Sequence, residues 1–181
     1  MTSSSIQSIA RQAETAFQSR QYERAAQLFD EAACSFTAAG DVLSAAEMNS
    51  NRSVALLQAG DPREALQAAQ GLERVFALAG DTRKQALALG NEAAALDALN
   101  QHKVALEKYQ QCAELLKQVG DHESRALVLK SISQIQLRTG HHLEALASMD
   151  AAIDNRKRPS LTERALKKLI KIPFDMLRRG G

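Results

Sequence analysis

The chain repeats itself every 40 residues. Three Gly-Asp pairs recur at that spacing, and further turn-forming pairs fall halfway between them: Gly40-Asp41, Gly80-Asp81 and Gly120-Asp121, then Gly60-Asp61, Asn100-Gln101 and Gly140-His141. Glycine tolerates the left-handed conformation that ends a helix, and aspartate accepts hydrogen bonds from the exposed N–H groups that open the next one. The stretches between these pairs have helical periodicity, so the sequence predicts helices of roughly 16 to 18 residues joined by tight turns.

One of these turns carries additional helix-start signals. Asp61 is followed by Pro62 at the expected first helical position, and Glu64 stands three residues after Asp61. Proline is favoured at this position because its missing N–H would have no partner there, and a glutamate at this distance suits a capping box. We therefore expect the turn at 60–61 to end one helix and start another.

The repeat continues inside the predicted helices. Positions one period apart share small or apolar residues, which allow helices to approach closely, while a fourth set varies in bulk. These sets are Ala13, Ser53, Ala93 and Ser133; Ala25, Ala65, Ala105 and Ala145; Ala32, Leu72, Cys112 and Ala152; and Phe29, Ala69, Tyr109 and Met149. Four units align without insertion. Since one helical hairpin cannot bury its apolar face alone, each unit must depend on its neighbours for stability.

Composition favours an all-α protein and excludes several other classes. The 181 residues are rich in Ala, Leu, Gln and Glu, with three prolines and no tryptophan. No apolar run approaches the ~20 residues of a membrane-spanning helix. The first residues, 1–5, lack both a basic start and an apolar export segment, so we expect a cytoplasmic protein. Cys34 and Cys112 are expected to be small core residues and not a disulfide.

With these four aligned units, the sequence resembles the tetratricopeptide repeat (TPR) family. The family's small-aromatic-small pattern in the second hairpin helix is matched by Ala25-Phe29-Ala32 and Ala105-Tyr109-Cys112, and its small residue in the first helix by the Ala13 set. The resemblance covers about residues 5 to 156. It implies a right-handed α-solenoid of four antiparallel helix hairpins, with repeats at about 5–40, 41–80, 81–120 and 121–158, forming one domain over 1–158.

The repeats depart from the commonest form of the family. Their period is 40 and not 34, an early aromatic is missing from the first helix, and the terminal proline is replaced by Thr37, Ala77, Lys117 and Lys157. The stretch from Leu87 through Asp121 resembles the long-repeat class of kinesin light chains and spindle-orientation adaptors. Those relatives bind peptides or partner proteins.

The resemblance also implies where a partner would bind. In such a solenoid the first helix of each hairpin lines the concave face, and its outward side chains define a groove. The register places the following predicted peptide-binding residues there: Arg11, Glu14, Glu47, Asn51, Gln58, Asn91, Asp97, Lys130, Gln134 and Arg138. Asn51 and Asn91 are equivalent positions, so their carboxamides could together hold the backbone of an extended peptide. The alternative is that these are solvated helix-surface residues.

The last part of the chain, 159–181, differs from the body in charge. Residues 156–181 hold nine basic and two acidic residues, a net charge of +7, and the remainder carries 14 basic and 19 acidic residues, or −5. After Pro159, Ser160 and Glu163 are placed as a capping box. An amphipathic helix follows, with Leu161, Ala165, Leu166, Leu169 and Ile170 on one face and Arg164, Lys167, Lys168 and Lys171 on the other.

Pro173 is expected to interrupt or kink this basic helix near Ile172 and to leave a short apolar segment beginning at Phe174. The simplest role for the helix is to cap the last hairpin, whose apolar side would otherwise be exposed. Alternatively, Lys167, Lys168, Lys171 and Phe174 contact an anionic membrane surface, a partner, or the acidic groove of the same or another copy.

No chemical motif accompanies the repeats. The sequence contains no Gly-rich phosphate loop, no clustered Cys/His metal set, and no nucleophile with an evident base, so no catalytic, cofactor-binding or metal-binding residues are assigned. Nucleic-acid binding is disfavoured by the acidic body. We therefore expect a non-enzymatic adaptor that binds a peptide or helical segment of a protein partner in its groove. The competing hypothesis is a self-associating or membrane-surface structural protein that acts through its basic helix.

Overall fold

The computed structural model describes the backbone of residues 3–179 and the side chains of residues 4–170. Every element of this described part is an α-helix, which confirms the predicted all-α class. The helices are α1 (Ser3–Gln18), α2 (Tyr22–Ala38), α3 (Val42–Ala59), α4 (Pro62–Ala69), α5 (Leu72–Leu78), α6 (Thr82–Ala98), α7 (His102–Gln118), α8 (His122–Arg138), α9 (His142–Asp154) and α10 (Leu161–Arg179). None of the described helices is long and apolar enough to cross a membrane.

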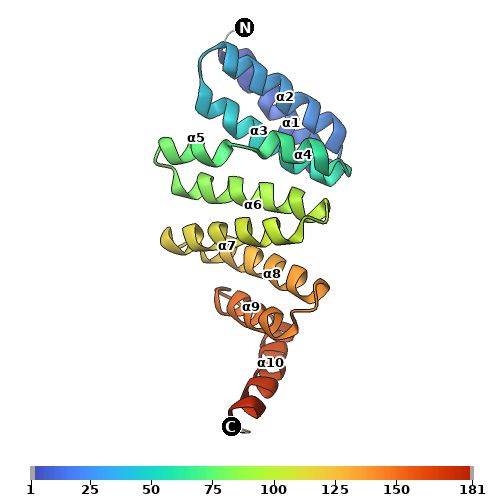
Figure 1. Ribbon diagram of the computed structural model, residues 1–181. Helices are drawn as coiled ribbons and strands as arrows, with labels where there is room; N and C mark the ends of the chain where they lie inside the picture. Colours follow the sequence, from blue (N-terminus) through green and yellow to red (C-terminus); the bar gives the residue numbers. More distant parts are fainter. Residues whose placement is uncertain (1–2, 180–181) are drawn as a thin grey trace. The chain divides into compact units, whose positions relative to one another are not determined.

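The chain forms two compact units, residues 1–108 and 109–181, whose boundary falls within α7. In the first unit α1 packs against α2, α2 against α3, α3 against α4, and α6 against both α4 and α5. Figure 1 shows this order as the blue to green part of the chain. In the second unit α8 packs against α9, and α9 contacts α10. The predicted division at residue 158 into a repeat domain and a separate C-terminal helix stays a prediction.

The predicted turns form at the expected glycines. Those at 40, 60, 80, 120 and 140 all have positive φ, as does Asn100 at 60°. Arg20 takes the same conformation with φ 59° between α1 and α2, although its residue type did not reveal the turn. An L-residue pays a steric cost in this region that glycine avoids.

Three aspartates cap the helices that follow them. Asp41 Oδ1 accepts from the Ser44 backbone N–H at 3.0 Å, and Asp81 Oδ1 accepts from that of Lys84 at 2.9 Å. Asp121 makes the equivalent bond to Ser124. Asp61 accepts no such bond, although Pro62 begins α4 as predicted. Aspartate capping is therefore confirmed at the 40-residue marks, and the expected cap at Asp61 is wrong.

The small residues of the register occupy the core. Both the Ala13 set and the Ala25 set are buried throughout. Where the first-helix position is serine, its hydroxyl donates to the carbonyl of the alanine in the facing helix: Ser53 Oγ to Ala65 O at 2.8 Å, and Ser133 Oγ to Ala145 O at 2.7 Å. The hydroxyl is thus satisfied inside the core, and it links the two helices of its hairpin.

The second helix of the second hairpin is broken, contrary to the predicted continuous helix. α4 ends at Ala69, Gln70 is extended, and Gly71 has φ +79° before α5 begins at Leu72. Figure 1 shows the two short helices as separate pieces. Glycine is a poor helix former, and here it provides the left-handed conformation that the bend requires. The regularity of the other repeats concealed this break.

The two cysteines differ in environment. Neither forms a disulfide, Cys112 is buried, and Cys34 is exposed on α2. Cys112 belongs to the Ala32 register set, so its position in the core was predictable. The expectation that Cys34 is a core residue is wrong, because residue 34 lies outside the four register sets.

The connection between α9 and α10 is held by polar contacts. The Ser160 backbone N–H donates to Glu163 Oε2 at 2.6 Å, and the Glu163 N–H donates to Ser160 Oγ at 3.2 Å. This reciprocal pair confirms the predicted capping box. The bond from the Ser160 backbone N–H, assisted by the Ser160 side chain and by Arg156, lowers the pKa of Glu163. The Lys157 backbone N–H also donates to Glu123 Oε1 at 3.0 Å, so α8 holds the connection as well.

α10 continues through Pro173 to Arg179, so an interruption near Ile172 is ruled out, whereas a kink at that place stays a prediction. Proline removes one backbone donor and crowds the preceding turn, but a helix can tolerate that cost when the sequence on both sides favours helix. The side chains of residues 171–179, including Phe174, lie outside those that the structure describes.

Candidate functional site

The first-helix face is the set of side chains predicted to point outward from α1, α3, α6 and α8. On α1 and α3 this face is largely open: Arg11, Glu14, Asn51 and Gln58 are exposed, and Glu47 is half-buried. These residues therefore reach the surface of the two helices, and their binding of a peptide stays a prediction.

Two hollows lie along α1 and α3. We call the first the Met48 hollow; it has a volume of about 390 Å³ and is lined by Gln7, Ala10, Arg11, Phe36, Ser44, Glu47 and Met48. We call the second the Val54 hollow; it has a volume of about 270 Å³ and is lined by Glu14, Phe17, Gln18, Phe29, Asn51 and Val54. Each hollow joins an apolar floor to a polar rim, and the rims include four of the predicted binding residues.

The apolar floors were not among the predicted site residues. Phe29 and Met48 are buried, and Phe17, Phe36 and Val54 are half-buried. Phe17 is held at the end of α1 by an edge-to-face contact with Tyr22 of α2, with ring centroids 5.5 Å apart. Phe29 and Phe36 come from α2, so only the packing of three helices places them beside the outward residues of α1 and α3.

α3 and α6, in contrast, are tied together across their first-helix faces. Lys84 Nζ lies 2.5 Å from Glu47 Oε1, and this hydrogen bond raises the pKa of Lys84. The Asn91 amide nitrogen donates to Ser50 Oγ at 3.0 Å and to Ser50 O at 3.3 Å. Asn91 is therefore half-buried and bonded to α3, whereas Asn51 is exposed. The two equivalent carboxamides do not present the same donors to a ligand.

The remaining predicted residue of α6 is also engaged within the first unit. Asp97 Oδ1 lies 3.0 Å from His102 Nδ1, at the turn between α6 and α7. Nearby, the buried Glu92 pairs with Lys108 at 2.8 Å. A buried carboxylate requires such a partner, so the pair of Glu92 with Lys108 helps to hold α7 to α6.

In the second unit the first-helix face lies on α8. Lys130, Gln134 and Arg138 are exposed there, together with Leu127. These four side chains recur at helical spacing and share one side of α8. This surface is basic, whereas the Met48 and Val54 hollows combine acidic, basic and amide groups.

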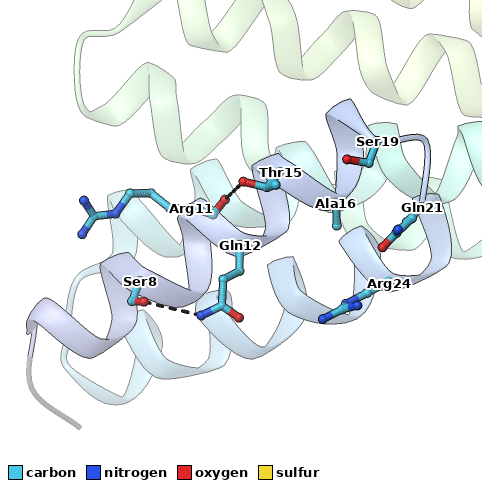
Figure 2. Close-up of a pocket in the computed structure, with 8 residues that line it drawn as sticks. All are labelled: Ser8, Arg11, Gln12, Thr15, Ala16, Ser19, Gln21 and Arg24. Carbon is cyan, nitrogen blue, oxygen red and sulfur yellow. Dashed lines mark hydrogen bonds between the residues drawn. The ribbon is translucent and has the colours of Figure 1, made fainter.

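A third hollow occupies another side of α1 (Figure 2). Its volume is about 360 Å³, and its lining is polar: Ser8, Arg11, Gln12, Thr15, Ala16, Ser19, Gln21 and Arg24. Figure 2 shows the guanidinium of Arg11 extending away from that of Arg24. Because the two cations do not converge, the hollow lacks the arrangement that an anion site requires.

The predicted tail contacts divide into two groups. Lys167 pairs with Asp154 of α9, and Lys168 is exposed. Lys171 and Phe174 lie outside the described side chains. α10 thus contacts α9 through a charged pair, and the connection after α9 also contacts α10, with Arg156 3.7 Å from Glu163. Ile170 is buried, but the three leucines of the predicted apolar face are exposed: Leu161 by 83%, Leu166 by 39% and Leu169 by 61%.

The described residues contain no group of three His, Cys, Asp or Glu side chains placed to hold a metal ion. On the first-helix face of α1 and α3, the structure shows two hollows with apolar floors and polar rims.

The fold of the chain is similar to those of known proteins, although its sequence is not. No protein-family model matches the chain, and no curated protein matches it in sequence. Its structure is similar to two crystal structures of nearly identical TPR-like repeats from a putative kinesin light chain of Podosopora anserina, one of them a single-substitution variant. Each is 14% identical, with a TM-score of 0.67, and the match covers 97% of this chain and 94% of the other.

Proposed function

Since the chain has the fold of TPR-like helical repeats, we propose that it is a non-enzymatic scaffold that binds a segment of a protein partner on the first-helix face of α1 and α3. The observation that carries this proposal is the pair of hollows with apolar floors and polar rims. Buried apolar contact supplies affinity, and the rim groups select and orient the segment. A cytoplasmic location for this activity stays a prediction.

Site-specific photo-crosslinking in cells tests this proposal. A photoreactive amino acid replaces Asn51, which is exposed at the Val54 hollow, and in a matched control it replaces Gln12, which is exposed on another side of α1. We expect discrete protein adducts from position 51 that are absent from position 12. Equal labelling at both positions, or labelling at neither, would contradict binding on this face.

A second candidate function uses α10. The exposure of Leu161, Leu166 and Leu169 beside the exposed cations Arg164 and Lys168 favours attachment to an anionic membrane surface, or self-association. The full-length double variant Leu166→Gln, Leu169→Gln tests both. Loss of co-sedimentation with phosphatidylserine vesicles would support the membrane function, and loss of an oligomer by light scattering would support self-association. A wild-type chain that neither co-sediments nor oligomerises would exclude this candidate.

A further inference from the structure

The two hollows on α1 and α3 are spaced regularly. On α1 the residues lining the Met48 hollow are Gln7, Ala10 and Arg11, and the corresponding residues of the Val54 hollow, Glu14, Phe17 and Gln18, follow seven positions later. On α3 the lining shifts in the same direction, from residues 44–48 to residues 51–54. At a helical rise of about 1.5 Å per residue, the hollows lie about 10 Å apart.

This spacing discriminates between ligand conformations. In an α-helix, residues seven apart lie on one face at about 10.5 Å. In an extended strand, residues on one face are about 6.7 Å or 13.4 Å apart, so two neighbouring anchors cannot enter both hollows. A polyproline helix repeats its face after three residues, or about 9.3 Å. The α-helix and the polyproline helix therefore remain as conformations that fit.

The polar groups favour the α-helix. A helix satisfies its own backbone hydrogen bonds, whereas an extended or polyproline backbone needs donors from the groove. The amide nitrogen of Asn91 already bonds to Ser50, so the regular pair of carboxamide donors that Asn51 and Asn91 were predicted to form is not available. What the surface offers is a pair of apolar floors with polar rims, the complement of an amphipathic helix.

Charge defines the ligand further. Glu14 is the only charged group among the residues lining the Val54 hollow, it is exposed, and on α1 it lies between the residues of the two hollows. The carboxylate of the other hollow, Glu47, is already paired with Lys84. A basic side chain between the two apolar anchors of the ligand would therefore meet Glu14.

We propose that the partner segment is an amphipathic α-helix. This inference rests on the proposed function and makes the ligand specific. The helix places two large apolar residues, seven positions apart, in the Met48 and Val54 hollows, and a basic residue between them opposite Glu14. The rest of the binding surface follows the helix along α1 and α3.

Synthetic probes of about 16 residues, close to the length of these helices, test the proposal on the full chain by fluorescence anisotropy. The helical probe has an Ala-Glu-Lys host sequence with leucines at positions five and twelve and arginine at nine. Its control moves the second leucine to position ten, on another side of the helix. A polyproline probe carries leucines three residues apart.

We expect the helical probe to bind. Its control should bind at least roughly tenfold more weakly, since one buried leucine is lost. The exposed positions Gln7 and Asn51 allow each hollow to be blocked without disturbing the core. Gln7→Trp and Asn51→Trp should each abolish binding of the helical probe, whereas Gln12→Trp should not. Glu14→Gln should weaken the arginine probe several-fold and leave a glutamine version of the probe unchanged.

The alternative outcomes separate this inference from the proposed function. The polyproline probe could bind preferentially and still lose binding when either hollow is blocked. That result would overturn the helical ligand but support binding on the first-helix face. Binding of the helical probe that is insensitive to both tryptophans would overturn both proposals. A chain that sediments as an oligomer dispersed by Asn51→Trp would identify a second copy as the occupant and overturn the inference. Failure of every probe, alongside specific adducts at position 51 in cells, would overturn only the ligand pattern.

Discussion

The second helix of the first hairpin, α2, runs unbroken from Tyr22 to Ala38, whereas its counterpart in the second hairpin is divided into α4 and α5. Both begin alike, with Ala25 and Ala65 fully buried in the same core cluster. They diverge where Phe29 and Glu31 of α2 are replaced by Ala69 and Gly71. Close contact between small residues thus sets how the helices pair, and residues further along decide whether the second helix stays continuous.

The largest effect on stability is expected at the buried alanine that the two hairpins have in common. Ala65→Leu adds three carbons at a site with no exposed surface and should destabilise the protein by about 1–3 kcal/mol. Ala25→Leu should cost a similar amount, because its environment is equivalent. Urea unfolding followed by circular dichroism measures both. A cost at only one of the two alanines would break the equivalence of the hairpins.

The break itself is tested at Gly71. Outside Gly71 and its two chain neighbours, no atom lies within 4 Å of where a Cβ would stand, so Gly71→Ala meets only the backbone cost of positive φ, about 1–2 kcal/mol. Glu31→Ala, at the equivalent exposed position of α2, should change stability by less than about 0.5 kcal/mol. Thermal unfolding of the two variants is the measurement. A stabilised Gly71→Ala protein with increased helicity would mean that α4 and α5 can join into one helix.

A smaller effect is expected from the hydroxyl that links α3 to α4. Ser53→Ala removes the bond to Ala65 O and should cost about 1 kcal/mol. The first hairpin has Ala13 at this position, so it achieves the same packing without the bond. Ser8→Ala, on the exposed surface of α1, is the control for chemical denaturation. An unchanged Ser53→Ala protein would show that packing alone joins the broken hairpin.

The smallest expected effect is a pH dependence of the helix starts. Capping bonds from the Ser44 and Lys84 backbone lower the pKa values of Asp41 and Asp81, the N-cap residues of α3 and α6. Because the folded-state pKa is the lower one, the stabilisation is present above the ordinary value of 3.8 and is lost as pH falls through the folded-state value. The double variant Asp41→Asn, Asp81→Asn keeps capping groups that do not titrate.

Urea midpoints at pH 6 and pH 3 measure that contribution. The wild-type midpoint should fall more than that of the double variant over this interval, and equal falls would rule out the two caps as its source.

The repeat predicted several outward residues of the proposed binding face, but it did not predict the apolar floors of the two hollows. The register identified Arg11, Glu14 and Asn51 as outward residues of first helices, because helical spacing alone determines which side of a helix a residue occupies. It did not find Phe29 or Phe36, which reach the hollows from the neighbouring helix. No spacing within one helix could reveal a floor supplied by another.

Sequence alone determined the helical class, the 40-residue period, the glycine turns and the small-residue core, because these follow from local conformational preference and from a pattern repeated four times. Tertiary structure decided which equivalent positions remain open. Asn51 and Asn91 share a register position, yet Asn91 is bonded to Ser50 while Asn51 faces solvent. The approach of one helix to the next, which depends on all the side chains between them, decides whether a polar group meets solvent or a neighbouring helix.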